Sequence, residues 1–289
     1  MLPQWLDAWW RVFGGEAEPC LGLVRRDGEV VGLCPLKVVA GTASFIGSAD
    51  VCDYMDFVVC PGEEASFFAA VSDELKRRGV GRLDLESLRP DSAALKGLEH
   101  MAPPDSACRP TDVSLVMPLG NSWEDYLGSL ESKQRHEIGR KLRRLEENGR
   151  MDFRIETTAE NLPVMLSLMR ASRSDKANFL TERMEQFFNL MAGAMVSLGI
   201  LRLGFLDING TPVASILCFD YDGTRYLYNS GYDPAFAYLS AGLLSKVLCI
   251  RDAIEKKMSY FDFLKGAETY KYQLGGQELT ISRCQAALK

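Results

Sequence analysis

The chain is 289 residues long, with 47% hydrophobic and 25% charged residues and a formal net charge of −6. This composition is that of a folded globular protein, and the length favours two modules because single domains usually have about 100–200 residues. The negative charge disfavours a general nucleic-acid binder, and no apolar run approaches the roughly 20 residues that would span a bilayer.

The first segment, MLPQWLDAWWRVFGG, carries no basic n-region and contains Asp7, so it does not read as a signal peptide. We therefore expect a cytoplasmic protein whose eight cysteines are reduced thiols, because none of them forms a CxxC pair. The only histidines are His100 and His136, and there is no HExxH motif, so we expect no metal site. A Ser-His-Asp triad is also poorly supported.

The first half of the chain predicts one helix and then short strands. Asp27-Gly28 is a typical two-residue hairpin turn, so residues 21–25 and 29–36 are expected to pair. The stretch Pro90 to Pro110 holds four prolines and is interpreted as a linker or crossover. The remaining predicted elements are helices at Pro3 to Val12 and Glu63 to Arg78 and strands at Ala43 to Ile46, Tyr54 to Val59 and Arg82 to Leu85.

The second half shows a fuller pattern of the same kind. Asn209-Gly210 is a clear hairpin signal between two strands. Predicted helices are Trp123 to Leu130, Lys133 to Asn148, Leu162 to Ser172 and Thr181 to Leu198. Predicted strands are Val113 to Met117, Phe153 to Glu156, Ile200 to Asp207, Pro212 to Tyr221 and Leu279 to Ala286.

The most informative stretch runs from Tyr226 to Lys271 and predicts a strand, a turn, a helix and a second strand. Ser240 is expected to cap the helix, and apolar residues at helical spacing from Leu243 to Ile254 indicate one buried face. Tyr260 to Leu264 returns to strand. A helix start with small residues and free N–H groups, aimed between two strands, is able to hold an anion such as a diphosphate. An ordinary capped αβ unit is the competing interpretation.

Together these patterns predict an α/β (α+β) protein with two related modules, each a mixed, mostly antiparallel sheet flanked by helices. The expected modules are residues 1–110, degenerate or truncated, and residues 111–289, more complete.

The sequence resembles the GNAT acyltransferase superfamily, specifically its CelD-like branch related to the Fem aminoacyl transferases. The resemblance rests on WEDYLGSLESKQRHEIGRKLRRLEENG, on TPVASILCFDYDGTRYLYNSGYDPAFAYLSAGLLSKVLCIRDAIEKKM and on YFDFLKGAETYKYQL. It covers about Trp123 to Leu274, and more weakly the first half. Relatives usually carry another strand and helix before the segment that matches Trp5 to Phe13. Two long heptad helices, which form the arm of the Fem enzymes, are not seen.

The resemblance implies that the donor's diphosphate lies at Ser240, Ala241, Gly242 and Leu243, where a bulky or acidic residue in place of Gly242 should block it. The usual diphosphate loop is reduced here to Tyr238-Leu239-Ser240-Ala241-Gly242. Tyr228, Asn229 and Tyr232 are expected beside the donor thioester, with aromatic strand packing as the alternative. The expected donor is acetyl-CoA or another acyl-CoA.

Asp262, Glu268, Tyr270 and Lys271 are the predicted catalytic residues. Glu268 or Asp262 would serve as the base, Tyr270 would supply a proton, and Lys271 would hold a phosphate or carboxylate of the acceptor. The alternative is that Asp262 belongs to a core-edge network and that the others are solvated loop charges.

Substrate binding is predicted for Lys133 and Arg140 on the basic helix, for Arg173 and for Tyr232. A solvated face is the alternative for the basic helix, and compensation of the helix C-terminus is the alternative for Arg173.

The sequence thus predicts a cytoplasmic N-acyltransferase that moves an acyl group from a coenzyme A thioester to an amine. The acceptor would be a sugar, a nucleotide sugar or a cell-envelope precursor in polysaccharide biosynthesis. Two alternatives are a Fem-like transferase that uses aminoacyl-tRNA, which the charge of −6 disfavours, and a non-catalytic descendant that only binds. The sequence does not specify an oligomeric state.

Overall fold

The structure is a computed structural model that describes residues 1–101 and 107–288. Contacts divide the chain into two compact units: unit 1 comprises Met1–Val113 and Leu279–Lys289, and unit 2 comprises Ser114–Glu278. The chain passes between them within strands β6 (Ala107–Pro118) and β12 (Gln277–Ala287). The first passage lies close to the predicted boundary at residue 110. The last strand, in contrast, lies in unit 1 because β12 pairs with β5.

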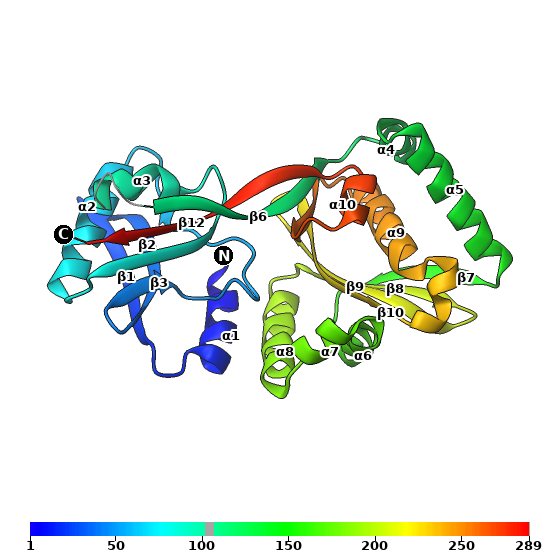
Figure 1. The fold of residues 1–289 in the computed structure, drawn as a ribbon, viewed down its shortest axis with the longest axis horizontal. Coiled ribbons are helices and arrows are strands. Elements are labelled where there is room, and N and C mark those ends of the chain that lie inside the picture. The colour runs from blue at the N-terminus through cyan, green and yellow to red at the C-terminus, as the bar shows by residue number, and fades with distance from the viewer. Residues whose placement is uncertain (102–106, 289) are drawn as a thin grey trace. The chain divides into compact units, whose positions relative to one another are not determined.

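Unit 1 is a sheet with the strand order β1-β2-β3-β5-β12, and β4 pairs with β2 (Figure 1). Its core includes Phe45, Phe57, Phe67 and Phe68, whose rings meet edge to face at centroid distances of 4.9–5.7 Å. The helices are α1 (Pro3–Phe13), α2 (Glu64–Arg77) and α3 (Ala93–Met101), and the strands that precede β6 are β1 (Glu18–Arg26), β2 (Glu29–Val39), β3 (Thr42–Phe45), β4 (Val58–Val59) and β5 (Arg82–Leu88).

The strand expected at Tyr54 to Val59 is wrong in extent, since it is reduced to β4. The stretch Pro90 to Pro110, expected to be a linker or crossover, holds α3 and the start of β6 between β5 and the rest of the chain; its residues 102–106 lie outside the described residues. Helix α3 is stabilised from a distance, because the Asp56 carboxylate accepts hydrogen bonds from the backbone N–H groups of Ala93 (2.7 Å) and Ala94 (2.9 Å).

A disulfide joins Cys108 of β6 to Cys284 of β12 in unit 1, with their Cα atoms 4.1 Å apart. The expectation that all eight cysteines are reduced is therefore wrong for this pair, which lies 176 residues apart in the sequence. The other six cysteines are free thiols. A neighbouring hydrogen bond from Thr111 Oγ1 to the carbonyl of Ile281 (3.3 Å) links the same two strands.

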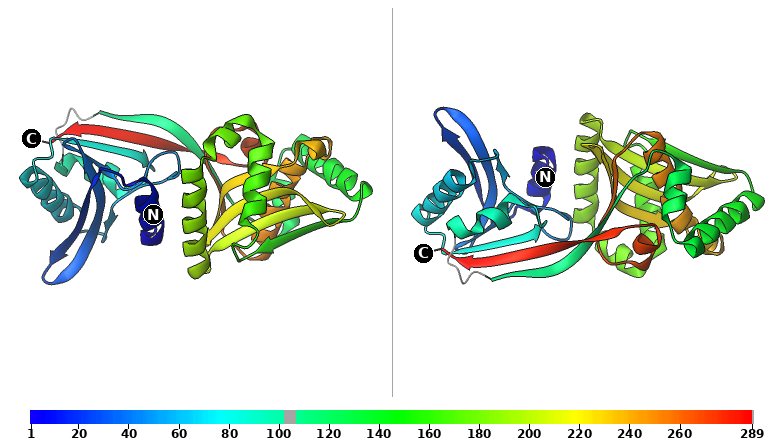
Figure 2. Two further views of the ribbon diagram at one scale, coloured as in Figure 1. Left: turned by 90° about the horizontal axis from the view of Figure 1, so that it is seen from below. Right: turned by 90° about the horizontal axis from the view of Figure 1, so that it is seen from above.

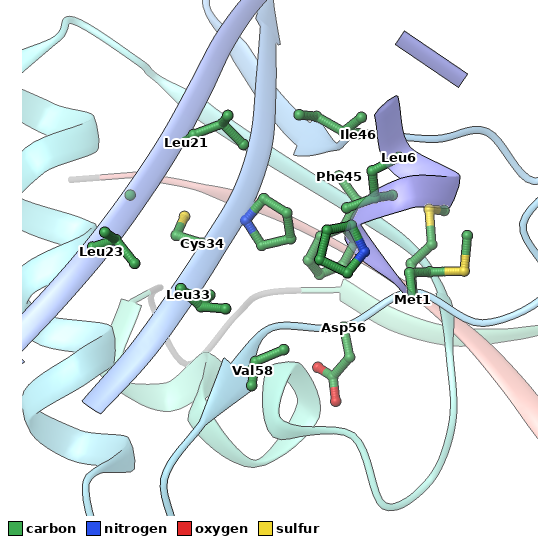
Figure 3. A pocket seen from close by; sticks show the side chains of 14 residues that line it. Met1, Leu6, Leu21, Leu23, Leu33, Cys34, Phe45, Ile46, Asp56 and Val58 are labelled. Carbon is green, nitrogen blue, oxygen red and sulfur yellow. The ribbon is translucent and has the colours of Figure 1, made fainter. Parts of the chain in front are cut away.

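Unit 1 also contains an apolar groove of about 450 Å³ between α1 and the β1–β2 hairpin (Figure 3). Leu21, Leu23, Leu33 and Val58 line it and are exposed. Asp56 is the charged side chain in the lining of this groove, and its carboxylate is already bound to the backbone of α3. The groove therefore offers apolar surface rather than reactive groups.

Unit 2 has the strand order β6-β11-β10-β9-β8-β7. Helices α6, α7 and α8 lie on one side of the sheet and α9 on the other (Figures 1 and 2). The helices are α4 (Trp123–Ser129), α5 (Ser132–Glu147), α6 (Leu162–Ser172), α7 (Ser174–Phe179), α8 (Glu182–Ser197), η1 (Pro234–Leu239), α9 (Ala241–Glu255) and α10 (Thr269–Gln273), and the strands that follow β6 are β7 (Met151–Glu156), β8 (Leu201–Ile208), β9 (Thr211–Tyr221), β10 (Thr224–Tyr232) and β11 (Tyr260–Lys265).

The predicted fold class is confirmed, since both units have mixed, mostly antiparallel sheets flanked by helices. The short helices α7 and α10 were not predicted, because neither is long enough to show a periodic apolar pattern. No helix in residues 1–101 or 107–288 has the length and apolarity that crossing a membrane requires.

Strands β10 and β11 run parallel but pair over only three residues each, Thr224–Tyr226 with Tyr260–Asp262. Strand β10 then continues through a bulge between Leu227 and Asn229, and it ends at Tyr232. Backbone groups on the facing edges of these strands beyond the paired stretch are therefore free of the β10–β11 ladder. This separation positions the candidate site.

A buried ion cluster fixes the paired end of these strands. Arg225, which is 0% exposed, donates to both carboxylate oxygens of Asp220 on β9 (2.7 and 2.9 Å) and to Asp252 on α9 (2.5 Å). Arg202 also pairs with Asp220 (2.9 Å). Burial lowers the pKa of the Arg225 guanidinium, but its hydrogen bonds to Asp220 outweigh this effect and hold the pKa above its ordinary value.

We expect Arg225→Met to lower the free energy of unfolding of unit 2 by about 3–5 kcal/mol, because Asp252 loses this partner and the buried Asp220 keeps only Arg202. Urea unfolding followed by circular dichroism measures this loss. Arg251→Met is the matched control on α9, where the exposed Arg251–Glu255 pair is worth at most about 1 kcal/mol. Equal losses in the two variants would contradict the structural role given to Arg225.

Candidate functional site

A polar cleft of about 520 Å³ lies in unit 2 where α9 begins. We call it the α9 cleft. It takes residues from α5, from the α6–α7 junction, from the end of β10, from η1 and α9, and from the start of α10. The lining residues are Lys141, Ser172, Arg173, Lys176, Ser230, Tyr232, Ala237, Ser240, Ala241, Gly242, Leu243, Lys246, Glu268, Thr269 and Tyr270.

Eight of the predicted site residues meet in this cleft. The predicted donor segment contributes Ser240, Ala241, Gly242 and Leu243, and the other four are Arg173, Tyr232, Glu268 and Tyr270. These residues come from segments that are up to about 100 positions apart in the sequence, and folding of unit 2 brings them together.

Close packing at the start of α9 leaves no room for a side chain at position 242, so this residue is a glycine. A Cβ atom at this position would lie 2.8 Å from Cδ1 of Tyr232. Ser240 directly precedes α9, as predicted, but its side chain makes no capping hydrogen bond. The reason is its left-handed backbone (φ 58°), whereas capping side chains act from an extended backbone.

Six predicted residues lie outside the cleft lining. Lys133 and Arg140 are on the exposed side of α5, where Arg140 pairs with Glu137, and Lys141 from the same helix faces the cleft instead. Tyr228 packs against Phe188 and Phe219, which is the aromatic alternative considered above. The remaining three are Asn229, Asp262 and Lys271.

Asp262 and Lys271 shape the backbone at the end of β11. The Asp262 carboxylate accepts from the N–H of Leu264 (2.7 Å), and Lys271 Nζ donates to the Leu264 carbonyl (3.0 Å). Leu264 has a left-handed backbone (φ 58°), which is unfavourable for a leucine. Both side chains therefore stabilise a strained turn.

The Lys271 ammonium, which is 2% exposed, also donates to the carbonyls of Lys265 (2.7 Å) and Gly266 (3.0 Å) and pairs with Glu268 Oε2 (2.9 Å). An ammonium has three donors, and four oxygens already surround this one. Lys271 therefore has no N–H left over for a ligand. Burial opposes the effect, but the hydrogen bond from Lys271 lowers the pKa of Glu268.

Two lysines in the cleft, the half-buried Lys176 and the buried Lys246, were not predicted. Lys176 Nζ, on α7, donates to Asn229 Oδ1 (3.0 Å) and to the carbonyl of Ser230 (2.5 Å). Burial, followed by the charge of Arg173, lowers the pKa of Lys176 to about 8. Asn229 therefore does not line the cleft itself but helps to position Lys176, which does.

Lys246 lies one turn after Gly242 in α9 and donates to the Gly242 carbonyl (2.7 Å). Burial, followed by the charge of Lys176, lowers the pKa of Lys246 to about 7. One sequence signal was available. Position 246 falls three residues after Leu243 and four before Ile250, so a lysine interrupts the apolar stripe of the helix.

Tyr270 and Arg173 complete the charged lining. The Tyr270 ring lies 5.0 Å from Lys246 Nζ, and burial, with the nearby Glu268 charge, raises the pKa of its hydroxyl. Arg173 is held by both carboxylate oxygens of Asp175 (2.9 Å each). Thus the cleft combines two amines that lose protons easily with a phenol that retains its own.

Residues 132–272 match the family model of the acetyltransferase (GNAT) domain. Every residue that lines the α9 cleft falls within this match. No curated protein matches the chain by sequence. The predicted resemblance to the GNAT superfamily is thereby confirmed.

Solved structures share the fold at low sequence identity. A crystal structure of FemX superposes with a TM-score of 0.68 at 12% identity, covering 98% of this chain and 90% of that chain. L-PGS from Bacillus licheniformis gives 0.62 at 10% identity, with 98% and 91% covered. A tandem GNAT protein from the clavulanic acid biosynthesis pathway gives 0.52 at 12% identity, with 98% and 94% covered. These likenesses concern the fold, which the chain shares with Fem and tandem GNAT proteins.

We expect Lys246→Met to stabilise unit 2 near neutral pH and this gain to vanish as the pH rises. The unfolded lysine has a pKa of 10.5 and the folded one about 7, so between these values the unfolded state binds the extra proton. Wild-type stability therefore increases with pH across that window. Below pH 7 the variant should be more stable by about 2–5 kcal/mol.

Urea unfolding of both proteins at several pH values between about 6 and 9 measures this difference. The comparison with wild type cancels the titration of other groups. A difference that does not change with pH would show that Lys246 has an ordinary pKa.

Proposed function

We propose that unit 2 is an N-acyltransferase that moves an acyl group from a coenzyme A thioester to the amine of a small acceptor. The observation that carries this proposal is the α9 cleft, a polar site at a helix start enclosed within the GNAT-domain match. Acetyl-CoA is the simplest donor that the family match implies. The acceptor would be an amino sugar, a nucleotide sugar or another cell-envelope precursor made in the cytoplasm.

The donor's diphosphate would bind at the start of α9. In the first turn of α9, the N–H groups of Leu243 and Leu244 already donate to the Ser240 carbonyl (3.0 and 2.9 Å). The diphosphate would therefore bind the N–H groups of Ala241 and Gly242, where the helix dipole favours an anion. Ser240, Ala241 and Gly242 line the cleft at this point, and Lys141 and Lys176 add positive charge. The left-handed Ser240 turns the chain into the helix.

The thioester would then lie along the end of β10, where this strand has separated from β11. A backbone N–H group of a separated strand is able to polarise a carbonyl by hydrogen bonding, although the N–H of Ser230 already donates to Asn229 Oδ1 (2.9 Å). Tyr232 and Ser230 mark this edge of the cleft. Holding an amine against the thioester supplies much of the rate enhancement through proximity.

Glu268 and Tyr270 would act on the acceptor side. The Glu268 carboxylate, with its lowered pKa, is charged at neutral pH and attracts the ammonium form of an amine. Tyr270 keeps its proton because burial raises the pKa of its hydroxyl, so it is able to protonate the departing thiolate. Arg173 at the cleft rim would bind an acidic group of the acceptor.

Isothermal titration calorimetry with coenzyme A and with acetyl-CoA tests donor binding. We expect wild-type protein to bind both in the micromolar range, and Gly242→Glu to lose at least about tenfold in affinity, which corresponds to 1.4 kcal/mol. The new side chain would displace Tyr232 and place a carboxylate where the diphosphate binds.

Gly193→Glu is the matched control, because an added Cβ at this exposed position of α8 has nothing within 4 Å. It should bind both ligands as wild type does. An absence of heat from folded wild-type protein would refute the thioester donor. Aminoacyl-tRNA would then be tested next, by salt-dependent binding.

A further inference from the structure

Lys246 is a buried amine whose side chain ends in the α9 cleft. It is 7% exposed, and its Nζ donates one hydrogen bond, to the Gly242 carbonyl (2.7 Å), and lies 5.0 Å from the centre of the Tyr270 ring. An amine in this setting is able to use its lone pair once it has lost a proton. Its position between the helix start and Tyr270 is where the acceptor and the thioester would meet.

The groups that face Lys246 come from several elements. Lys176 of α7 repels its charge, whereas Glu268 favours the charged form, as do the thiols Cys218 of β9 and Cys249 of α9. Lys141 of α5, Arg173 and Tyr270 line the same cleft. Burial and Lys176 prevail, so the pKa of Lys246 falls to about 7 and a large share of the amine is neutral at neutral pH.

The other titratable groups near the cleft are less suited to accept a proton. Lys271 has its three donors engaged by four oxygens. Glu268 is paired with Lys271, which lowers its pKa and weakens it as a base. Lys176 has a pKa of about 8, so most of it stays protonated at neutral pH, and its Nζ already donates to Asn229 Oδ1 and to the Ser230 carbonyl. Tyr270 retains its proton.

We propose that Lys246 is the general base that deprotonates the acceptor's ammonium group. This assignment rests on the proposed function of the same cleft, and it replaces the carboxylate bases considered from the sequence. Lys246 is a catalytic residue in this proposal, because its Nζ would touch the reacting nitrogen.

The proton balance is as follows. The acceptor's R–NH₃⁺ gives one proton to the Lys246 amine, and the resulting R–NH₂ attacks the thioester carbonyl carbon. A C–N bond forms and the C–S bond breaks. The nitrogen loses a second proton as the amide forms, which replaces the proton that Tyr270 gives to the leaving thiolate. Lys246 returns its proton to solvent, so one amide, one free thiol and one proton are produced.

Steady-state kinetics with acetyl-CoA and amino-sugar acceptors (glucosamine, glucosamine 6-phosphate and a UDP-linked amino sugar) test this assignment across a range of pH. For the acceptor that turns over fastest, wild-type kcat/KM should fall on the acid side with an apparent pKa near 7. Lys246→Met should lower kcat by about 10²–10⁴-fold and remove that acid limb. Lys246→Arg should lose as much, because a guanidinium does not give up its proton.

Lys256→Met, at the exposed end of α9, is the control and should keep the wild-type profile. Calorimetry with coenzyme A, unchanged in the Lys246 variants, would show that the donor site is intact. Wild-type activity with an unaltered pH profile in Lys246→Met, or activity restored by Lys246→Arg, would overturn the base assignment alone. No turnover by wild type with any of these acceptors would instead count against the proposed function, and the assignment would fall with it.

Discussion

The buried guanidinium of Arg225 is the interaction on which the geometry of unit 2 depends. It lies in the short stretch where β10 pairs with β11, and it binds Asp220 of β9 and Asp252 of α9. These elements are fixed together at one end, because a buried charge without its partner costs several kcal/mol. At their other end the two strands have separated and α9 begins, and there the α9 cleft lies. Strands β10 and β11 and helix α9 are thus held together near Arg225, and the α9 cleft forms at their opposite end.

The sequence was informative where structure depends on neighbouring residues. Asn209-Gly210 predicts the β8–β9 hairpin because both residues adopt positive φ values (51° and 79°), which this tight turn requires. The disulfide between Cys108 and Cys284 was missed because its partners lie 176 residues apart. The local cap of helix α3 by Ser92 was overlooked, and the start of this helix also depends in part on a similar distant pairing, since Asp56, 37 positions earlier, accepts hydrogen bonds there. Local patterns carry no information about such pairings.

The site was predicted in its chemistry more than in its geometry. The segment Ser240 to Leu243 was predicted as one unit because its residues are neighbours in the sequence, and all four of them line the cleft. Lys271 has the charge expected of a catalytic group, but surrounding carbonyls engage its three donors. Whether an ammonium is free or already bound depends on backbone oxygens that a sequence pattern does not locate. Lys246 was the reverse case, because its place on an apolar helix face was visible, and a lysine held there must lose its proton or find a partner.

At two positions, close packing in the fold leaves no room for a side chain, whereas several charged residues of the cleft are not constrained in this way. A Cβ at Gly231 would lie 2.1 Å from the backbone nitrogen of Met169 in α6, and one at Gly242 would press on the Tyr232 ring. Both glycines are therefore required by the packing of the fold, and the fold is what this chain shares with solved structures at 10–12% identity. Lys176 and Lys246 are not required by packing of this kind. Their two amines contribute to the charge of the cleft together with Lys141, Arg173 and Glu268. In the proposed reaction, two protonated amines would repel the acceptor's ammonium group, whereas one neutral amine would leave Glu268 able to attract it. Selection among acceptors would therefore rest on side chains that the fold does not dictate.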